Sequence, residues 1–440
     1  MPCPSPAERL TAAVEAALGV LPRGPLVVGY SGGMDSSLLL HCAARSAVAR
    51  ARGLRALHVH HGLHPDADAW AVQAQARAQA LGMACDLVRV QVDPRVQGIE
   101  AAAREARLAA FAAALAAGGA MLLAHHQDDQ AETLLLRLLR GASVDGLGAM
   151  RAVRAHGAGL ILRPWLDQPR ALLRQAAQEL GIAWVEDPAN VDPKFDRSWL
   201  RQQAWPLLAA RFPALGERLA RLAGHAASVS DEIEALAAAQ LERLGGGDPD
   251  TLSVSGLLAL PEALYGAVLR RHARLLGVHP PGFHELQRIR AEVLLAKPDA
   301  NPILRQDGFE YRRYRDRLYL LDQASTAPIG ERTIEWRAGQ PAVQLPGGLG
   351  TLALVDAAGN AVPAAVDLWV GWRRGGERIR PAGSAHTREL RLLFQEQGVP
   401  PWRRERIPLL WHGKELLAAV GVANSARMAQ LLPEAELRLG

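Results

Sequence analysis

A run rich in glycine and serine, SGGMDSS at residues 31–37, offers the clearest chemistry in the sequence. It follows the apolar run Pro25 to Tyr30 and leads into Asp35 to Ala51, which has the composition of a helix. Glycines let the backbone approach a phosphate closely, hydroxyls donate hydrogen bonds, and a helix N-terminus supplies free N–H groups. The run therefore predicts an anion cradle between a strand and a helix. The alternative is an ordinary glycine turn in which Asp35 caps the helix.

The run is not a Walker A loop, because that motif requires a lysine and the first lysine of the chain is Lys194. The carboxylate of Asp35 would repel phosphates unless a divalent cation lay between them. We therefore expect Asp35 to help place Mg²⁺ beside a bound phosphate.

Two carboxylates, Asp129 and Glu132, follow the histidines of the segment HHQDDQAET at 125–133. A spacing of three places both carboxylates on one face of a helix, where they form a compact anionic site. Such a site suits an ammonium group or Mg²⁺. The alternative is a helix that Asp128 caps and whose other carboxylates are solvated.

Two further segments carry polar side chains that could serve a site. The segment HVHHGLH at 58–64 holds four histidines, which indicate polar strand caps or a metal site. In the segment GIEAAAREAR at 98–107, Glu100 and Arg104 are four apart and can pair on an exposed helix. Arg104 could also stabilise charge that develops on a phosphate.

Strand-like and helix-like segments alternate through the first half of the chain, with strand-like runs at 25–30, 54–60, 85–92 and 120–125. This alternation predicts an α/β fold with a doubly wound parallel sheet, whose ligands bind at the carboxyl ends of the strands.

The remaining chain shows helical spacing at 211–244, 257–276 and 284–295, a hairpin pattern at 308–321, and strand-like runs over 326–367. We therefore expect three domains: a catalytic α/β domain over 1–210, a mainly helical domain over 211–325, and a small α+β domain over 326–440.

Composition limits the class of protein. The chain has 440 residues and a net charge of +5, and the stretch from Trp372 to Arg406 holds nine arginines against four glutamates. This local surplus of positive charge equals the surplus of the whole chain, and it favours contact with a polyanion. Trp372 and Trp402 would be available for stacking on bases. The alternative is a solvated basic face.

Three cysteines without a CxxC pair argue against a disulfide framework and against a metal cluster held by cysteines alone. With no signal peptide or membrane span evident, we expect a cytoplasmic protein.

The run SGGMDS resembles the phosphate loop of the PP-loop ATP pyrophosphatases. Within that superfamily the chain resembles one branch, the tRNA(Ile)-lysidine synthetases, almost from end to end. The other matching segments are HVHHGL at 58–63, EAAAREAR at 100–107, HHQDDQAET at 125–133, RPWL at 163–166, EDPAN at 186–190, FDRSWLR at 195–201, and 390–410. Ala189 stands for the usual serine and Ser198 for the usual asparagine, so the resemblance does not carry over the hydrogen bonds of those two side chains.

The resemblance implies that ATP adenylates O2 of the wobble cytidine in a tRNA(Ile) with a CAU anticodon, and that L-lysine then displaces AMP. It implies Mg²⁺ as cofactor and leaves open whether the chain forms a homodimer. Together with the patterns above, it assigns ATP binding to Ser31, Gly32, Gly33, Met34, Asp35, Ser36, Ser37 and His60, and catalysis to Asp35, Arg104, Asp129 and Glu132. It assigns lysine binding to Asp129 and Glu132, and tRNA binding to Arg197, Arg201, Arg373, Arg374, Arg403 and Arg404.

Two other functions stay open. A different PP-loop enzyme, such as a tRNA thiolase or an amidating synthetase, would use the same phosphate loop, but thiolases commonly need catalytic or cluster-binding cysteines. A basic RNA-binding protein without catalytic activity could keep a nucleotide fold. ATP turnover that depends on tRNA would separate such a protein from an enzyme.

Overall fold

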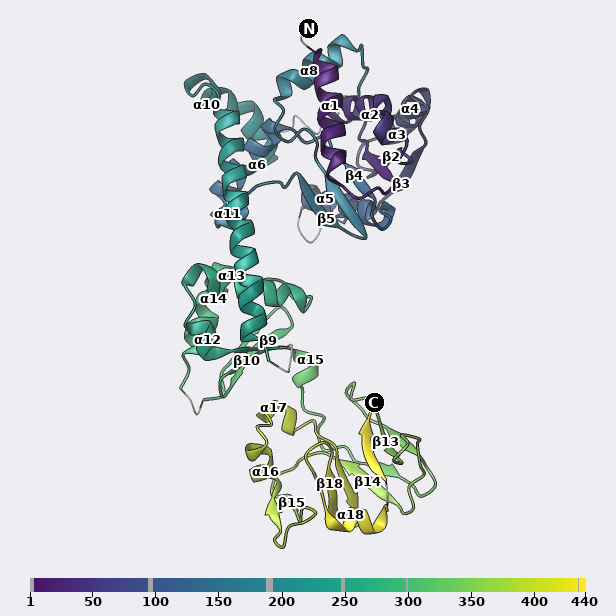
Figure 1. Ribbon diagram of the computed structural model, residues 1–440, viewed down its shortest axis with the longest axis vertical. Coiled ribbons are helices and arrows are strands. Elements are labelled where there is room, and N and C mark those ends of the chain that lie inside the picture. The colour runs from purple at the N-terminus through teal and green to yellow at the C-terminus, as the bar shows by residue number, and fades with distance from the viewer. Residues whose placement is uncertain (1–3, 94–97, 187–192, 247–249, 298–299, 434) are drawn as a thin grey trace. The chain divides into compact units, whose positions relative to one another are not determined.

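The computed structural model describes residues 4–93, 98–186, 193–246, 250–297, 300–433 and 435–440 (Figure 1). The chain forms two compact units, of which the first ends at Glu232 and the second begins at Ile233. This boundary falls inside the long helix α11 (Leu215–Leu244). The three domain ranges that we expect from the sequence stay predictions.

A six-stranded sheet forms the centre of the first unit, in the order β3-β2-β1-β4-β6-β5. Its strands are β1 (Leu26–Gly29), β2 (Arg55–His60), β3 (Cys85–Arg89), β4 (Ala120–Leu122), β5 (Val153–His156) and β6 (Gly159–Leu162). All neighbours are parallel except the edge strand β5, which runs antiparallel to β6. The doubly wound parallel sheet is confirmed, and the hairpin β5–β6 is an addition that the sequence analysis did not predict.

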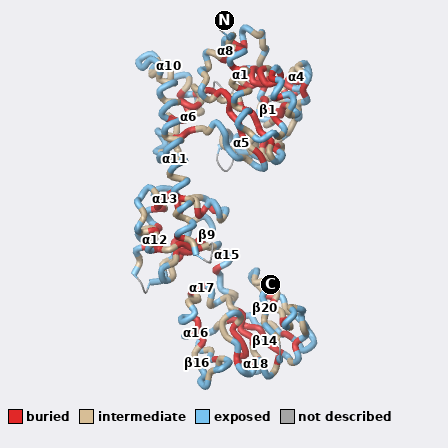
Figure 2. The backbone as a smooth tube through the Cα atoms, in the orientation of Figure 1, coloured by how far each residue is buried: buried red, intermediate tan, exposed pale blue. Residues whose placement is uncertain are grey.

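Helices cover both faces of this sheet because its buried strands are apolar on both sides. Leu26 and Val28 of β1 belong to a core that includes α1, α2, α4 and α8, whereas Val27 packs in a second core with Phe111 of α5. Figure 2 shows this buried centre. The helices of the unit before α11 are α1 (Pro6–Gly19), α2 (Met34–Arg45), α3 (Ala47–Arg50), α4 (Ala67–Ala80), α5 (Ile99–Ala114), α6 (Gln127–Leu139), α7 (Val144–Leu147), α8 (Arg170–Glu179), α9 (Asp196–Trp199), the π-helical η2 (Leu200–Ala204) and α10 (Trp205–Arg211).

The second unit begins with helices packed on a four-stranded antiparallel sheet, in the order β7-β10-β9-β8. The predicted hairpin at 308–321 is confirmed as β9 and β10. In place of the single helix predicted over 257–276, one helix ends at Leu258 and the next begins at Glu262, with Pro261 as its N-cap. The elements are β7 (Thr251–Ser253), α12 (Val254–Leu258), α13 (Glu262–Leu275), α14 (Phe283–Arg288), the π-helical η3 (Ile289–Leu294), β8 (Ile303–Gln306), β9 (Phe309–Tyr314), β10 (Arg317–Asp322) and α15 (Gln323–Thr326).

The C-terminal part of this unit is α+β, as expected, with sheets β11-β14-β17-β18-β19, β12-β13-β20 and β15-β16. Trp372 and Trp402 are each only 4% exposed, so the expectation that they are available for stacking on bases is wrong. The strands are β11 (Ile334–Trp336), β12 (Ala342–Gln344), β13 (Thr351–Val355), β14 (Leu368–Gly371), β15 (Arg378–Ile379), β16 (Arg388–Glu389), β17 (Leu409–His412), β18 (Glu415–Ala419), β19 (Ala423–Asn424) and β20 (Glu436–Leu439), and the helices are α16 (Leu390–Glu396), α17 (Pro401–Arg404) and α18 (Ala426–Leu431).

No helix in the described parts of the chain combines the length and the apolar character that a membrane span requires.

Candidate active site

The phosphate loop connects β1 to α2 and is shaped by its own hydroxyl groups. The Oγ atoms of Ser31 and Ser36 lie 3.0 Å apart, and the Gly33 N–H donates to Ser31 Oγ at 3.4 Å. Gly32 has φ +86°, a backbone conformation that residues with a Cβ rarely adopt. The loop is therefore folded into a fixed turn at the carboxyl end of a central strand, where the sequence analysis placed it.

The N-terminus of α2 opens directly onto this loop. Its N-cap residue is Gly33, which has no side chain to accept from the first turn of the helix. First-turn N–H groups have no partner within a helix, so they are available to an anion. Ser36 and Ser37 are buried, which keeps their hydroxyls at the base of the loop.

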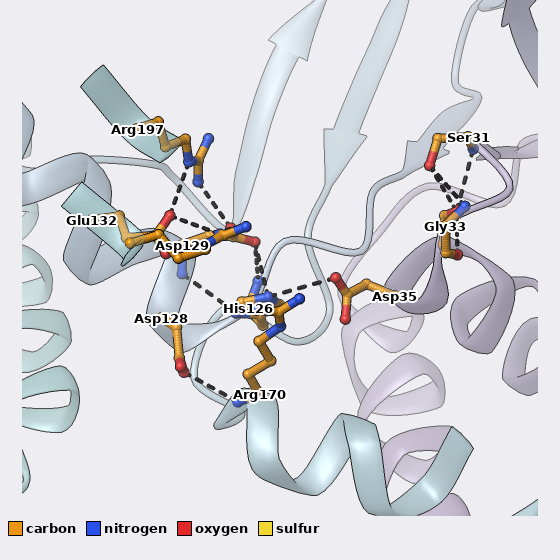
Figure 3. A network of polar contacts seen from close by, with 11 residues as sticks. Ser31, Gly33, Asp35, His126, Asp128, Asp129, Glu132, Arg170 and Arg197 are labelled. Atoms are coloured by element: carbon orange, nitrogen blue, oxygen red, sulfur yellow. Dashed lines mark hydrogen bonds and ion pairs between the residues drawn. The ribbon is translucent and has the colours of Figure 1, made fainter. Parts of the chain in front are cut away.

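Asp35 lies in the first turn of α2 and points toward His126 (Figure 3). Its Oδ1 is buried without a hydrogen-bond partner, and its Oδ2 lies 3.8 Å from His126 Nε2. Burial raises the pKa of Asp35 above its usual value, although the charges of His126 and Arg170 oppose this shift. A buried carboxylate oxygen without a partner, beside a phosphate loop, has the donor chemistry that Mg²⁺ uses.

The described residues contain no cluster of three His, Cys, Asp or Glu side chains that could hold a metal ion by themselves. Mg²⁺ commonly binds through one or two carboxylates together with substrate phosphates and water. Asp35 alone is therefore compatible with Mg²⁺ that arrives with a nucleotide.

His126 joins this loop to the carboxylate segment, and the sequence analysis did not assign it a role. It is 1% exposed and caps α6, where its Nδ1 accepts from the Asp129 N–H at 3.4 Å. Its Nε2 lies 3.4 Å from Asp129 Oδ2. The ring thus lies between Asp35 and Asp129, and its place within the run HHQDD was the only sign of this in the sequence.

Asp129 and Glu132 lie on one face of α6, as the spacing predicted, and both face arginines (Figure 3). Arg197 Nη2 lies 2.9 Å from Asp129 Oδ1, and its Nε lies 2.9 Å from Glu132 Oε2. Arg201 contacts the same two carboxylates, with Nε 2.7 Å from Glu132 Oε1 and Nη2 3.2 Å from Asp129 Oδ1. The two arginines that we expected to bind tRNA thus pair with the two carboxylates that we expected to bind lysine.

This four-residue network balances its own charge, with two carboxylates against two guanidinium groups. Burial raises the pKa of Asp129, but His126, Arg197, His125 and Arg201 outweigh burial and hold this pKa below its usual value. Asp129 therefore stays ionised. Because two guanidinium groups already balance the two carboxylates, a further cation would bind weakly unless one arginine turned to another anion.

Arg170 is a second residue without a predicted role. Its backbone N–H begins α8 and donates to Asp128 Oδ1 at 3.1 Å, while its side chain extends toward His126 and Asp35 (Figure 3). The buried Nε of Arg170 has no hydrogen-bond partner. A guanidinium with an unused donor at this position could donate to a phosphate oxygen.

His60, expected at the nucleotide, is buried at the end of β2, and its Nε2 lies 3.2 Å from Asp68 and 3.3 Å from Arg89. His58 lies nearer the loop, because its Nδ1 is 2.9 Å from the carbonyl of Tyr30. Burial lowers the pKa of His58.

Arg104, expected at the α-phosphate, is exposed on α5. Arg107, one turn further along, is partly buried, and burial together with the charges of Arg104 and Arg197 lowers its pKa. Arg107 therefore lies close enough to Arg197 for the two positive charges to repel each other. Ala189 lies outside the described residues, and Ser198 is buried on α9.

The four basic residues predicted for tRNA in the second unit divide into two kinds. Arg404 Nε donates to the Val399 carbonyl at 2.8 Å, and Arg373 Nε, which is buried, lies 3.9 Å from Glu377. Arg374 and Arg403 are exposed. The exposed pair is the better candidate for phosphate contacts.

Comparisons with known proteins cover most of the chain. Family models match at residues 6–208 (PP-loop domain), 252–319 (TilS substrate binding domain) and 368–439 (TilS substrate C-terminal domain). A tRNA(Ile)-lysidine synthase of Alkalilimnicola ehrlichii is 41% identical over 92% of this chain and 91% of the relative. One of Xanthomonas campestris is 42% identical over 95% of each chain.

Among solved structures, a U34-tRNA thiolase from Methanococcus maripaludis resembles 51% of this chain and 80% of its own, with a TM-score of 0.42 and 14% identity. The relatives in sequence are far more similar and match from the phosphate loop to the C-terminal sheets. The chain therefore belongs to the tRNA(Ile)-lysidine synthase family of PP-loop enzymes.

Proposed function

We propose that this chain ligates L-lysine to C2 of the wobble cytidine of a tRNA(Ile) with a CAU anticodon, and that ATP is cleaved to AMP and pyrophosphate. The observation that carries this proposal is similarity over at least nine tenths of the chain to relatives named tRNA(Ile)-lysidine synthase. The site supports it, because a phosphate loop and a carboxylate network meet at the carboxyl ends of one parallel sheet. We expect this reaction to take place in the cytoplasm.

The first step adenylates the cytidine. Its O2 attacks the α-phosphorus of ATP, the bond from that phosphorus to the bridging oxygen breaks, and pyrophosphate leaves. The loop from Ser31 to Ser37 and the N-terminus of α2 would hold the phosphates. Asp35 would hold Mg²⁺, which neutralises phosphate charge when bound. Arg170 reaches the same space and would stabilise negative charge on the phosphates.

The second step forms the bond between carbon and nitrogen. A neutral lysine amine attacks C2, AMP leaves with the electrons of the C2–O2 bond, and one amine proton goes to a base. We propose that Asp129 and Glu132 bind the incoming lysine. Because Arg197 and Arg201 already balance these carboxylates, lysine would bind once an arginine turns to a phosphate of the adenylated tRNA.

The thiolase alternative has less support. In the described chain, Cys42 is buried and burial raises its pKa to about 11, and burial also raises the pKa of Cys85. A thiolate is the reactive form of cysteine, so neither residue has the surroundings of a nucleophile.

Separating the two half-reactions tests the proposal. Pyrophosphate release should require tRNA and ATP but not lysine, and lysidine should appear only when lysine is added. Glu132→Gln should raise the lysine concentration for half-maximal lysidine formation about 10- to 100-fold, the value of one or two charged hydrogen bonds, while pyrophosphate is still released. Glu217→Gln is the control, since that carboxylate is 62% exposed on α11.

The opposite result would reassign the carboxylates. If Glu132→Gln abolishes pyrophosphate release and leaves the lysine dependence unchanged, the pair serves Mg²⁺ and ATP rather than lysine. If pyrophosphate release never depends on tRNA, the proposed function itself fails.

A further inference from the structure

His125 and Arg163 follow two neighbouring parallel strands at the edge of the candidate active site. Leu122 at the end of β4 pairs with Leu162 at the end of β6. His125 and Arg163, which follow these strands, therefore lie just beyond the carboxyl end of the sheet. Arg163 Nε donates to His125 Nδ1 at 3.1 Å, and Arg163 Nη1 donates to the Arg151 carbonyl at 2.7 Å. Arg163 is only 6% exposed, so its two contacts fix the guanidinium in one orientation.

This contact determines which nitrogen of His125 carries the proton. Arginine can only donate, so Nδ1 must accept, and a neutral ring then carries its hydrogen on Nε2. The structure gives Nε2 no hydrogen-bond partner within the described ranges. His125 therefore has one nitrogen occupied by Arg163 and one N–H donor left over.

Charged groups from four elements face the ring of His125: Asp129 on α6, Arg163 after β6, Arg197 on α9 and Arg107 on α5. Burial, together with the three arginines, lowers the pKa of His125 to about 3 against the opposing charge of Asp129. The imidazole is therefore neutral from pH 5 to 8. A protonated ring here would add a fourth cation to three arginines.

We propose that Arg163 is a positioning residue that holds His125 as a neutral Nε2–H donor, and that this N–H binds an acceptor oxygen of the substrate. The inference rests on the proposed function, which brings a phosphate and a pyrimidine carbonyl to this site. Arg107 and Arg197 already supply positive charge. A neutral donor adds a directed hydrogen bond without adding to the repulsion among them.

The test compares Arg163→Met with Arg163→Lys, because lysine can still donate to Nδ1 and methionine cannot. Arg163→Met should lower kcat for lysidine formation about 10- to 100-fold, the usual effect of losing the group that orients a functional histidine, with a smaller change in KM. Arg163→Lys should recover much of this loss. His125→Gln gives the scale of the full effect, and Arg9→Met, at an exposed position on α1, is the matched control.

A second readout does not depend on catalysis. In ¹⁵N-histidine-labelled protein, the imidazole resonances that disappear in His125→Gln belong to His125. They should show one Nε2–H tautomer that does not titrate between pH 5 and 8. In Arg163→Met these resonances should show a mixture of tautomers or a titration. A His125 ring that takes up a proton at low pH would add a positive charge beside Arg107 and Arg197. The pH profile of kcat in this variant should therefore gain a limb that falls toward acid.

Three results would overturn the inference: a wild-type His125 that carries its proton on Nδ1, an Arg163→Met variant with unchanged tautomer and kcat, or an Arg163→Lys variant that folds as wild type but is no better than Arg163→Met. Absence of lysidine formation by the wild-type protein would instead count against the proposed function, and the tautomer measurement would still decide the role of Arg163.

Discussion

Arg201 binds Glu132 through two parallel hydrogen bonds, from Nε to Oε1 at 2.7 Å and from Nη2 to Oε2 at 2.8 Å. The Glu132 side chain is only 4% exposed, so its charge depends on this guanidinium and on that of Arg197. A buried carboxylate that loses a partner is costly.

We predict that Arg201→Met lowers the free energy of unfolding by about 2 kcal/mol, the range of a hydrogen bond to a charged group. The double variant with Glu132→Gln should lose less than the sum of the two single variants, because glutamine no longer needs a cation. Urea unfolding of the four proteins measures this coupling. Additive losses would show that the two side chains do not depend on each other.

Asp35 should reduce the stability of the free protein at neutral pH. Because its pKa is raised in the fold, the ionised form costs free energy above that pKa, and the cost fades as the pH falls toward the ordinary value of 3.8. Asp35→Asn should therefore raise Tm at pH 7, and this gain should shrink toward pH 4.5. Asp66→Asn, at an exposed carboxylate, should show no such trend.

The same variants test the magnesium proposal without any turnover. ATP with Mg²⁺ should raise the Tm of the wild-type protein more than ATP with EDTA does. In Asp35→Asn this difference should vanish. A full Mg²⁺ effect in Asp35→Asn would remove Asp35 from the metal site.

Gly32 and Gly33 should respond differently to alanine. A Cβ at Gly32 meets nothing within 4 Å, but the φ of +86° strains it, whereas a Cβ at Gly33 lies 3.5 Å from Ser31 Oγ in ordinary contact. Gly32→Ala should cost roughly 1–2 kcal/mol and reduce pyrophosphate release, while Gly33→Ala should keep wild-type stability. Thermal unfolding compares the two, and equal losses would contradict the loop conformation.

The basic residues of the second unit should separate into those that bind phosphates and those that hold the fold. Replacing the exposed Arg374 and Arg403 with glutamine should weaken tRNA binding and reduce its log–log salt slope by about 0.7–0.9 for each phosphate that these side chains neutralise. Arg404→Gln should instead lower Tm, because Arg404 bonds the Val399 carbonyl and Tyr314 Oη. An unchanged salt slope in the Arg374 and Arg403 double variant would show that these two side chains are solvated and do not contact tRNA phosphates.

The sequence predicted features that depend on local spacing. The phosphate loop lies between β1 and α2, and Asp129 and Glu132 share a face of α6, because neighbours along a helix or turn determine both. The break before α13 was missed, although Pro261 within the predicted range 257–276 indicates it, because proline disfavours the interior of a helix.

Pairings across long stretches of chain were not readable. Arg197 meets Asp129 from 68 residues away, and Asp128 meets Arg170 across 42 residues. A single sequence does not show which distant residues come into contact. Arg197 and Arg201, in a helical segment, therefore indicated an exposed helix surface or a tRNA-binding site. The hairpin β5–β6 was missed because each strand has only four residues and β5 is largely exposed.

Analysis of the modified nucleoside tests the central claim most directly. The full chain is incubated with tRNA(Ile) that has an unmodified CAU anticodon, Mg²⁺, ATP and isotopically labelled lysine, and the wobble nucleoside is then identified by mass. We predict one labelled lysine on the wobble cytidine, with AMP and pyrophosphate formed in equal amounts. A wobble cytidine that stays unmodified while the protein is folded and binds ATP, or one that gains sulfur or ammonia in place of lysine, would contradict this account.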